Sequence, residues 1–407
     1  MKKILLFMLG GLMSLPVLGT DFTYENQGQT LSYTILDENA KTCMVNSNNN
    51  NKSGANISGK VEIPETVIYD NTEYSVTSIG TKAFSSCSGL SEVTIPTSVT
   101  SIGNDAFYNC SGLTSMKIPD SVTSIGTYAF SNCSGLTSLT ISSSLTSIND
   151  CTFSGCSSLT SVTIPGSVTS IEWSAFSSCS NLAEVTIPNS VSSIGQTAFS
   201  DCTSLTSVTI PTSVNSIGES AFARSGLTSV TIPGSVTSMG RFAFSNCESL
   251  TSVNIQNSTV SDYAFYECLN LETVILGENV TSIGEGAFAI SSEDETTSKI
   301  NKIISVRATP PTLASTAFNN SVKSIATVYA PSSSLESYRN ADGWREFENY
   351  ADVTLGVENI TGGRNEGVEI YTLDGVRIFK GAESDIKLGA GIYIIRQGND
   401  VKKISVK

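Results

Sequence analysis

Apolar residues recur along this chain with a period close to 23 residues, and the clearest marker is a phenylalanine that usually follows alanine. The marker advances in six steps of 23 and then in steps of 22, 21 and 23, through Phe84, Phe107, Phe130, Phe153, Phe176, Phe199, Phe222, Phe244, Phe265 and Phe288. A fixed period of this length is typical of a solenoid in which each repeat forms one coil. The register breaks after Phe288, so the pattern predicts about ten full coils followed by a degenerate one.

Within one repeat, the spacing of apolar residues predicts two short strands joined by turns. Alternation over residues 116–118 indicates a first strand, and residues 122–125 indicate a second. Pro119 and Gly126 mark the turns that follow these strands, and Phe130 is expected in a helical or 3₁₀ turn. A coil this small cannot bury its own apolar face, so we expect coils stacked about 4.8 Å apart around one continuous core.

The repeat text "SVTSIGxxAFxxCSxLTSVTIP" runs nearly unchanged from Val76 to Ile290. It resembles the BspA-like (Treponema-type) leucine-rich repeat family, and "GKVEIPETV" at 59–67 is similar to the entry segment of that family. The resemblance implies a β-rich leucine-rich-repeat solenoid of about ten 23-residue coils over residues 76–350, including a closing cap. Residues 20–75 would form an N-terminal capping segment over the exposed apolar end of the rod.

The first 19 residues have the layout of a secretory signal peptide. Lys2 and Lys3 precede an apolar stretch from Ile4 to Leu18, and small residues stand before a cleavage site at Thr20. The stretch is too short, and too often broken by Gly and Pro, for a good membrane span. No other segment reaches 18 apolar residues, so we expect an exported mature chain without a transmembrane segment, extracellular or on the outer cell surface.

Residues 351–407 leave the repeat and alternate as short strands. "VEIYTLDGVRI" at 368–378 predicts a hairpin around Asp374 and Gly375, and residues 391–406 predict a second hairpin. This segment resembles the C-terminal sorting domain of type IX secretion in Bacteroidota. The alternative is a small immunoglobulin-like β-sandwich that serves as a cap or stalk. Either reading gives a small C-terminal all-β domain.

Composition narrows the chemistry that the chain can perform. It has 407 residues and no His, which excludes His-dependent catalytic units, His-ligated zinc and His proton shuttles. A formal charge of -14 argues against a nucleic-acid partner. We find no catalytic constellation, no Cys-x-x-Cys pair for a metal site and no requirement for a cofactor.

Ten cysteines in an exported chain would ordinarily predict disulfides, but their spacing contradicts that reading. Eight of them lie three residues after the marker phenylalanine and therefore share one column of the solenoid. Side chains that point inward in parallel, about 4.8 Å apart, do not have the converging geometry of a disulfide. We therefore predict a buried ladder of free thiols, formed by Cys87, Cys110, Cys133, Cys156, Cys179, Cys202, Cys247 and Cys268.

Positions beside the Ala-Phe pair vary most between repeats, and variation at fixed outward positions is how repeat proteins build binding surfaces. Several hold aromatic or basic side chains where serine or threonine would suffice. The candidate binding residues are Tyr108, Tyr128, Trp173, Arg241, Phe242, Tyr263 and Tyr266. The alternative is that each ring only drapes over a neighbouring coil. Ser and Thr columns along the first strand offer either a polar array for a glycan or simple β-propensity.

These observations favour a secreted or cell-surface adhesin. By the family resemblance, its partners would be host extracellular matrix proteins or other bacterial proteins. A second hypothesis is a carbohydrate-binding surface module that uses Trp173 and nearby tyrosines as stacking platforms. A third is a structural element of the envelope or a protease inhibitor without a small ligand. The sequence predicts no enzymatic activity.

Overall fold

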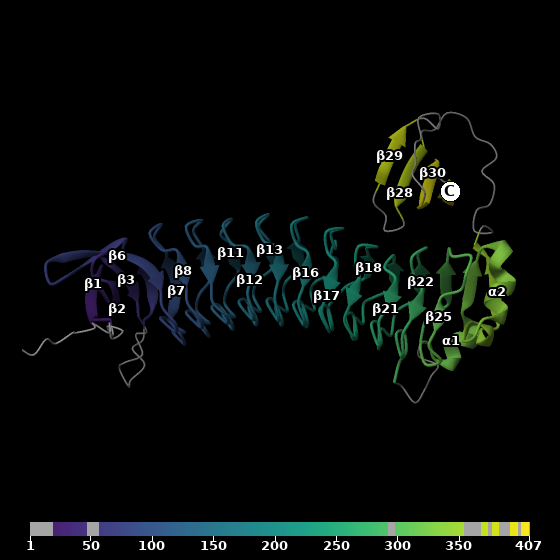
Figure 1. Ribbon diagram of the computed structural model, residues 1–407, viewed down its shortest axis with the longest axis horizontal. Coiled ribbons are helices and arrows are strands. Elements are labelled where there is room, and N and C mark those ends of the chain that lie inside the picture. The colour runs from purple at the N-terminus through teal and green to yellow at the C-terminus, as the bar shows by residue number, and fades with distance from the viewer. Residues whose placement is uncertain are drawn as a thin grey trace, which may run out of the picture.

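The computed structural model describes residues 19–46, 57–291 and 298–353, together with the backbone of four strands between 368 and 406. Over its main part the chain forms an elongated solenoid whose coils stand side by side (Figure 1). It has about 12 turns. Apart from Gly19, the predicted signal peptide lies outside the described residues. Within the part of the chain that the structure describes, no helix is long and apolar enough to span a membrane.

An antiparallel sheet covers the N-terminal end of the solenoid. The strands β1 (Asp21–Asn26), β2 (Gln29–Asp37) and β3 (Thr42–Val45) pair antiparallel in sequence order. β3 then pairs parallel with β6 (Thr72–Ile79), which also pairs antiparallel with β5 (Thr66–Tyr69) and parallel with the first coil. This cap therefore converts an antiparallel sheet into the parallel stacking of the coils, with Phe22, Tyr33 and Tyr74 buried beneath it.

Each typical coil contributes two short strands, as the repeat pattern predicts. The longer strands form one row: β4 (Gly59–Glu62), β7 (Leu90–Thr94), β9 (Ser115–Lys117), β11 (Ser138–Thr140), β13 (Ser161–Thr163), β15 (Glu184–Thr186), β18 (Ser229–Ile232), β20 (Ser252–Ile255), β22 (Thr273–Leu276), β24 (Lys302–Ser305), β26 (Thr327–Ala330) and β27 (Asn349–Asp352). The last three show that the sheet continues beyond the sequence register lost after Phe288.

Two-residue strands form the second row. They are β8 (Ser101–Ile102), β10 (Ser124–Ile125), β12 (Ser147–Ile148), β14 (Ser170–Ile171), β16 (Ser193–Ile194), β17 (Ser216–Ile217), β19 (Ser238–Met239), β21 (Thr259–Val260), β23 (Ser282–Ile283) and β25 (Thr312–Leu313). These strands are shorter than the predicted 122–125. The N–H of Val122 donates to the carbonyl of Pro119 (3.0 Å), so that residue belongs to the turn.

Phe130 lies in a hydrogen-bonded turn, as predicted, with the N–H of Ser131 donating to Tyr128 (3.1 Å) and that of Cys133 to Phe130 (3.2 Å). The turn forms neither an α-helix nor a 3₁₀ helix. Every second N–H of this turn donates to the next coil: Tyr128 to Asp150 (3.0 Å), Phe130 to Thr152 (2.9 Å) and Asn132 to Ser154 (2.7 Å). Tyr128 and Asn132 have φ values of 58° and 59°. Because left-handed residues interrupt a right-handed helix, the turn instead joins the ladder between coils.

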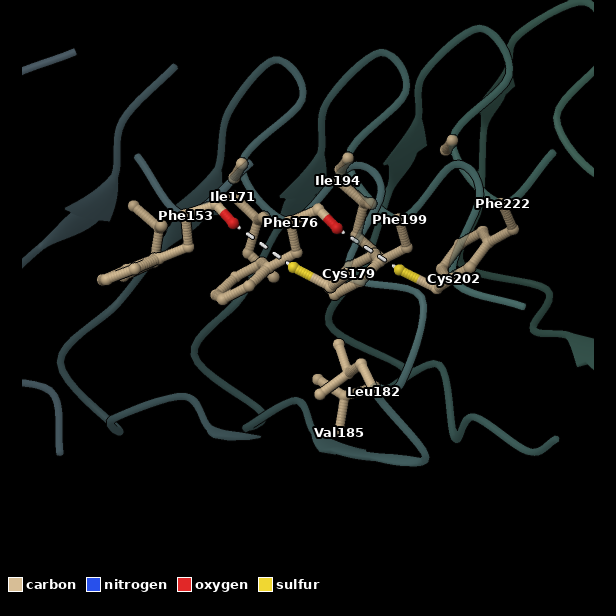
Figure 2. Close-up of a cluster of buried hydrophobic side chains, with 14 of the residues drawn as sticks. Phe153, Ile171, Phe176, Cys179, Leu182, Val185, Ile194, Phe199, Cys202 and Phe222 are labelled. Atoms are coloured by element: carbon tan, nitrogen blue, oxygen red, sulfur yellow. Dashed lines mark hydrogen bonds between the residues drawn. The ribbon is translucent and has the colours of Figure 1, made fainter. Parts of the chain in front are cut away.

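Phenylalanine rings stack along the interior of the solenoid. Successive rings from Phe84 to Phe318 lie 4.9–5.5 Å apart between centroids and within 16° of parallel. Figure 2 shows four of them in a row, with the cysteine column beside them. Every coil supplies one phenylalanine at the same position of its turn. The stacked coils therefore place the rings in one continuous row, the aromatic ladder, along the core.

Short helices close the C-terminal end of the solenoid: α1 (Asn320–Ile325), η3 (Ser332–Ser334), α2 (Leu335–Asn340) and η4 (Trp344–Glu346). Trp344 and Phe347 are buried, and the indole N–H of Trp344 donates to the carbonyl of Pro311 (2.7 Å). The buried ammonium of Lys323 pairs with Glu346 (2.7 Å). The apolar end of the last coil is thereby covered.

The described backbone after residue 367 forms one antiparallel sheet. Its order is β29 (Arg377–Gly381), β28 (Val368–Thr372), β30 (Gly391–Gln397) and β31 (Asp400–Val406). β28 pairs with β29, and β30 pairs with β31, in the order expected for the two predicted hairpins. The Asp374 and Gly375 turn lies outside the described residues, and a sorting domain or a sandwich remains a prediction for this part.

Candidate binding surface

The turn that carries the marker phenylalanine positions the variable side chains. In each coil the Ala and Phe side chains are buried, while residues two and three before the Phe, and one after it, stand beside them. The residue two before the Phe has a positive φ, for example 58° at Phe242 and 56° at Tyr263. Because consecutive coils repeat this geometry, side chains at the same position of neighbouring coils lie against one another.

Four of the seven candidate binding residues meet in one place. The rings of Phe242 and Tyr263 stack with centroids 5.1 Å apart, and Tyr266 meets them edge-on at 6.3 and 5.5 Å. The guanidinium of Arg241 lies over both stacked rings, 5.5 Å from Phe242 and 5.2 Å from Tyr263. We call Arg241, Phe242, Tyr263 and Tyr266 the aromatic–arginine cluster.

A glycine ends this stack on its C-terminal side. Gly286 occupies the next coil's equivalent of Tyr263, and a Cβ built there would lie 2.5 Å from Cε1 of Tyr263. The absence of a side chain lets the Tyr263 ring lie against the backbone. Phe242, Tyr263 and Tyr266 are all half-buried, so the cluster is held in place and still presents ring surface to solvent.

Arg241 is exposed, and none of the salt bridges between described residues includes it. Glu219 and Asp262 occupy its equivalent position in the two neighbouring coils. The guanidinium is therefore oriented by two rings while its N–H groups remain available. An arginine held flat on aromatic faces offers five donors in a fixed arrangement to a partner.

The other three candidates lie apart from the cluster. Tyr108 and Tyr128 are half-buried on earlier coils, and Trp173 is 43% exposed. The hydroxyl of Tyr128 shares a hydrogen bond with the Cys151 thiol, which raises the tyrosine's pKa. None of these three rings stacks on another aromatic ring of the described chain. Tyr108 and Tyr128 are thus partly covered, whereas Trp173 presents an isolated exposed ring.

Some variation beside the Ala-Phe pair serves the stacking of coils. The side-chain oxygens of Asn104, Asp150 and Asp262 accept hydrogen bonds from the backbone N–H groups of the next coil, at 3.0, 3.1 and 2.9 Å. These carboxylates and amides satisfy backbone donors of the neighbouring turn. These three side chains are therefore structural, and the aromatic and basic residues of the column are the candidates for recognition.

Hydroxyl side chains divide into two groups. Those near the second strand bond to the previous coil, as Thr123 Oγ1 does to the carbonyl of Thr100 (3.3 Å) and Ser190 Oγ to that of Val168 (2.6 Å). Those on the longer strands, such as Thr163 and Thr186, are exposed. The predicted polar array therefore exists as a solvent-facing row, without any aromatic ring among its central members.

The eight column cysteines all lie in the core with free thiols. Seven of them donate to the carbonyl of the marker phenylalanine in the preceding coil, as Cys179 does to Phe153 (3.2 Å) and Cys202 to Phe176 (3.3 Å) (Figure 2). Ser225 takes the column position in the shortened coil, and its hydroxyl lies 3.3 Å from the thiol of Cys247. Cys43 and Cys151, outside the column, are also buried and free.

Burial makes these thiols poor nucleophiles. It raises the pKa of Cys133 and of Cys179 to about 12, and it raises the pKa of Cys110, Cys156 and Cys202 as well. Cys247 is the exception, because hydrogen bonds with Cys268 and Ser225 lower the pKa of its thiol. The thiolate is the reactive form of cysteine. Among the described residues, no group of three His, Cys, Asp or Glu side chains could hold a metal ion. The column therefore packs the core of the solenoid.

Sequence reasoning missed a surface notch next to the cluster. A depression of about 340 Å³ is lined by Asp201, Thr203, Arg224, Ser225, Gly226, Asn246, Glu248 and Ser249. The available signal was the 22-residue step. The leucine that recurs in each repeat follows Phe199 and Phe244 by six residues but follows Phe222 by only five. One residue is missing from the middle turn, and the two flanking turns form the walls of the notch.

The repeats identify the family. A model of the BspA type leucine rich repeat region matches six copies, over residues 65–183, 171–295 and 260–342. The chain belongs to the BspA type leucine-rich repeat family. The family model describes a repeat region and no catalytic domain. The predicted resemblance is thereby confirmed for the solenoid, and the sorting-domain resemblance of the C-terminal part stays a prediction.

Solved structures with similar folds come from several bacteria. A leucine-rich repeat protein from Bacteroides ovatus is 24% identical, with a TM-score of 0.47, over 81% of this chain and all of its own. A leucine rich cell surface protein from Faecalibacterium prausnitzii is 24% identical, with a TM-score of 0.47, over 84% of this chain and 96% of its own. The pneumococcal vaccine antigen PcpA is 17% identical, with a TM-score of 0.39, over 82% and 99%. No curated protein matches the chain.

Proposed function

We propose that this BspA type repeat protein is an exported surface adhesin that binds an extracellular protein through the aromatic–arginine cluster. The observation that carries the proposal is the convergence of Arg241, Phe242, Tyr263 and Tyr266 from two consecutive coils. Tyr and Arg, together with Trp, are the side chains most enriched at the energetic centres of protein interfaces. Solenoids bind through such variable positions because the repeated coils hold them in a rigid array.

The proposed location and partners follow from the sequence and the family. The N-terminal segment has the layout of an export signal, and the C-terminal segment resembles a sorting domain that would place the chain at the cell surface. The partner would be a host matrix protein or a protein of another bacterium. A protein partner suits the cluster better than a glycan does, because a guanidinium covers the ring faces on which a sugar would stack.

Solid-phase binding of the purified chain to matrix proteins, beside a glycan array, tests this proposal. We expect saturable binding to a protein, weakened about 30-fold by Phe242→Ala or Tyr263→Ala, because truncation of a buried interface anchor costs about 2 kcal/mol. Tyr329→Ala is the matched control, since Lys302 lies over the Tyr329 ring at 5.4 Å in a similar cation–π pair on another face. This variant should bind as the parent does.

The other results have clear meanings. Binding lost in Trp173→Ala but kept in Phe242→Ala would move the contact surface to the isolated tryptophan. Binding to glycans alone, competed by the free sugar, would favour the carbohydrate-binding hypothesis. Protein binding that all four variants retain would contradict the cluster as the anchor, and no binding at all would contradict a host matrix protein as the partner.

A further inference from the structure

The notch at Arg224 is a depression in the solenoid surface that three consecutive turns form together. Its floor contains Ser225, which is 3% exposed, and its walls come from the turns before and after the shortened coil. The notch and the aromatic–arginine cluster belong to the same turns: Asn246, which lines the notch, follows Phe242 by four residues, and its N–H donates to the carbonyl of Tyr266 (2.7 Å). A partner that covers the cluster would therefore also reach the notch.

The charges around the notch favour a cation. Arg224 forms a salt bridge with Asp201, with 3.6 Å between Nη1 and Oδ1. Glu248 forms no salt bridge with a described residue. The lining therefore keeps one uncompensated carboxylate. Residues 196–291, which carry both the notch and the cluster, hold eight carboxylates and two guanidinium groups, a formal charge of -6. A field of this sign attracts basic partners and repels acidic ones.

The shape and the lining together select a side chain type. A depression of about 340 Å³ that is open to solvent admits one long side chain rather than a folded element. The hydroxyls of Thr203 and Ser249 and the carboxylate of Glu248 can accept hydrogen bonds from an ammonium or guanidinium group. A carboxylate inserted there would meet Glu248 and Asp201 instead. A neutral side chain would gain no attraction from the exposed Glu248 carboxylate.

We propose that the notch receives a lysine or arginine side chain from a basic segment of the protein that binds over the cluster. This inference rests on the proposed function and adds the chemistry of the partner: an aromatic contact at Phe242 and Tyr263, and a basic residue inserted at Arg224, Asn246 and Glu248. The shortened coil then has a role, since the missing residue makes room for that side chain.

The test uses an oligolysine peptide and the same peptide with every lysine acetylated, titrated into the full chain by calorimetry. We expect the lysine peptide to bind, more weakly as salt is raised, and the acetylated peptide not to bind. Glu248→Gln should weaken binding about fivefold. Glu25→Gln removes the same charge from an exposed carboxylate at the far end of the rod and should have little effect.

A second variant tests the shape of the notch. Insertion of one serine between Ser225 and Gly226 restores the length of the neighbouring turns and should abolish the difference between the Glu248→Gln and Glu25→Gln variants. Equal loss in both carboxylate variants, or equal binding of the acetylated peptide, would overturn the inference. Protein binding that depends on Phe242 but not on Glu248 would reject the notch and keep the adhesin. The converse result would keep the notch and reject the cluster.

Discussion

Raising the pH from 8 to 10 is expected to lower the free energy of unfolding by about 8 kcal/mol through the buried thiols alone. Burial raises the pKa of seven column cysteines, with Cys133 and Cys179 near 12 against an ordinary value of 9.0. A hydrogen bond with Cys268 lowers the pKa of Cys247, which offsets one of these seven contributions. A raised folded pKa gives stability that is complete below pH 9 and is lost as the pH rises toward 12. Each thiol that ionises only in the unfolded chain removes about 1.4 kcal/mol over this interval.

Urea unfolding at several pH values measures this slope. A chain with Cys156→Ser, Cys179→Ser and Cys202→Ser is the control, because a hydroxyl can donate to the same phenylalanine carbonyls and Ser225 already occupies this column. Its stability should fall about 4 kcal/mol less between pH 8 and 10. Equal pH slopes for the two chains would show that the column thiols are not protected from ionisation in the folded state.

Replacing one ring of the aromatic ladder is expected to cost as much as any single substitution in this chain. Phe176 is fully buried, and its ring lies 5.4 Å from Phe153 and 5.5 Å from Phe199. Phe176→Ala should lower the free energy of unfolding by about 3–5 kcal/mol, because it removes buried area and leaves a cavity between two rigid coils. Denaturant unfolding followed by circular dichroism measures the change.

Trp173→Ala is the matched control in the same coil. This larger side chain is 43% exposed and stands three residues before Phe176, so its removal should cost clearly less stability than Phe176→Ala. Since each coil contacts only its neighbours, Phe176→Ala should also divide the unfolding transition into two steps. Similar losses for the two variants would contradict the assignment of the core to the phenylalanine column.

The sequence alone was sufficient for the solenoid, for its core and for the column of the thiols. A 23-residue period places Phe176, Cys179 and their equivalents at the same position in every coil. Stacking of the coils then brings equivalent residues into contact. The prediction was less accurate at the turn around Phe130, because left-handed φ values at non-glycine residues are rare and a residue such as Tyr128 has no preference for them.

Only the tertiary structure decided which surface residues act together. Sequence columns treated Trp173 and Arg241 alike, but the structure leaves Trp173 alone and places Arg241 over Phe242 and Tyr263. The 22-residue step was visible in the sequence, yet its consequence depended on whether the flanking turns closed over the missing residue. They are held by their own hydrogen bonds to adjacent coils, as at Asn246, so the deletion remains an open notch. The sequence period determines which side chains are buried. Contacts between neighbouring coils of different sequence determine which exposed side chains come together on the surface.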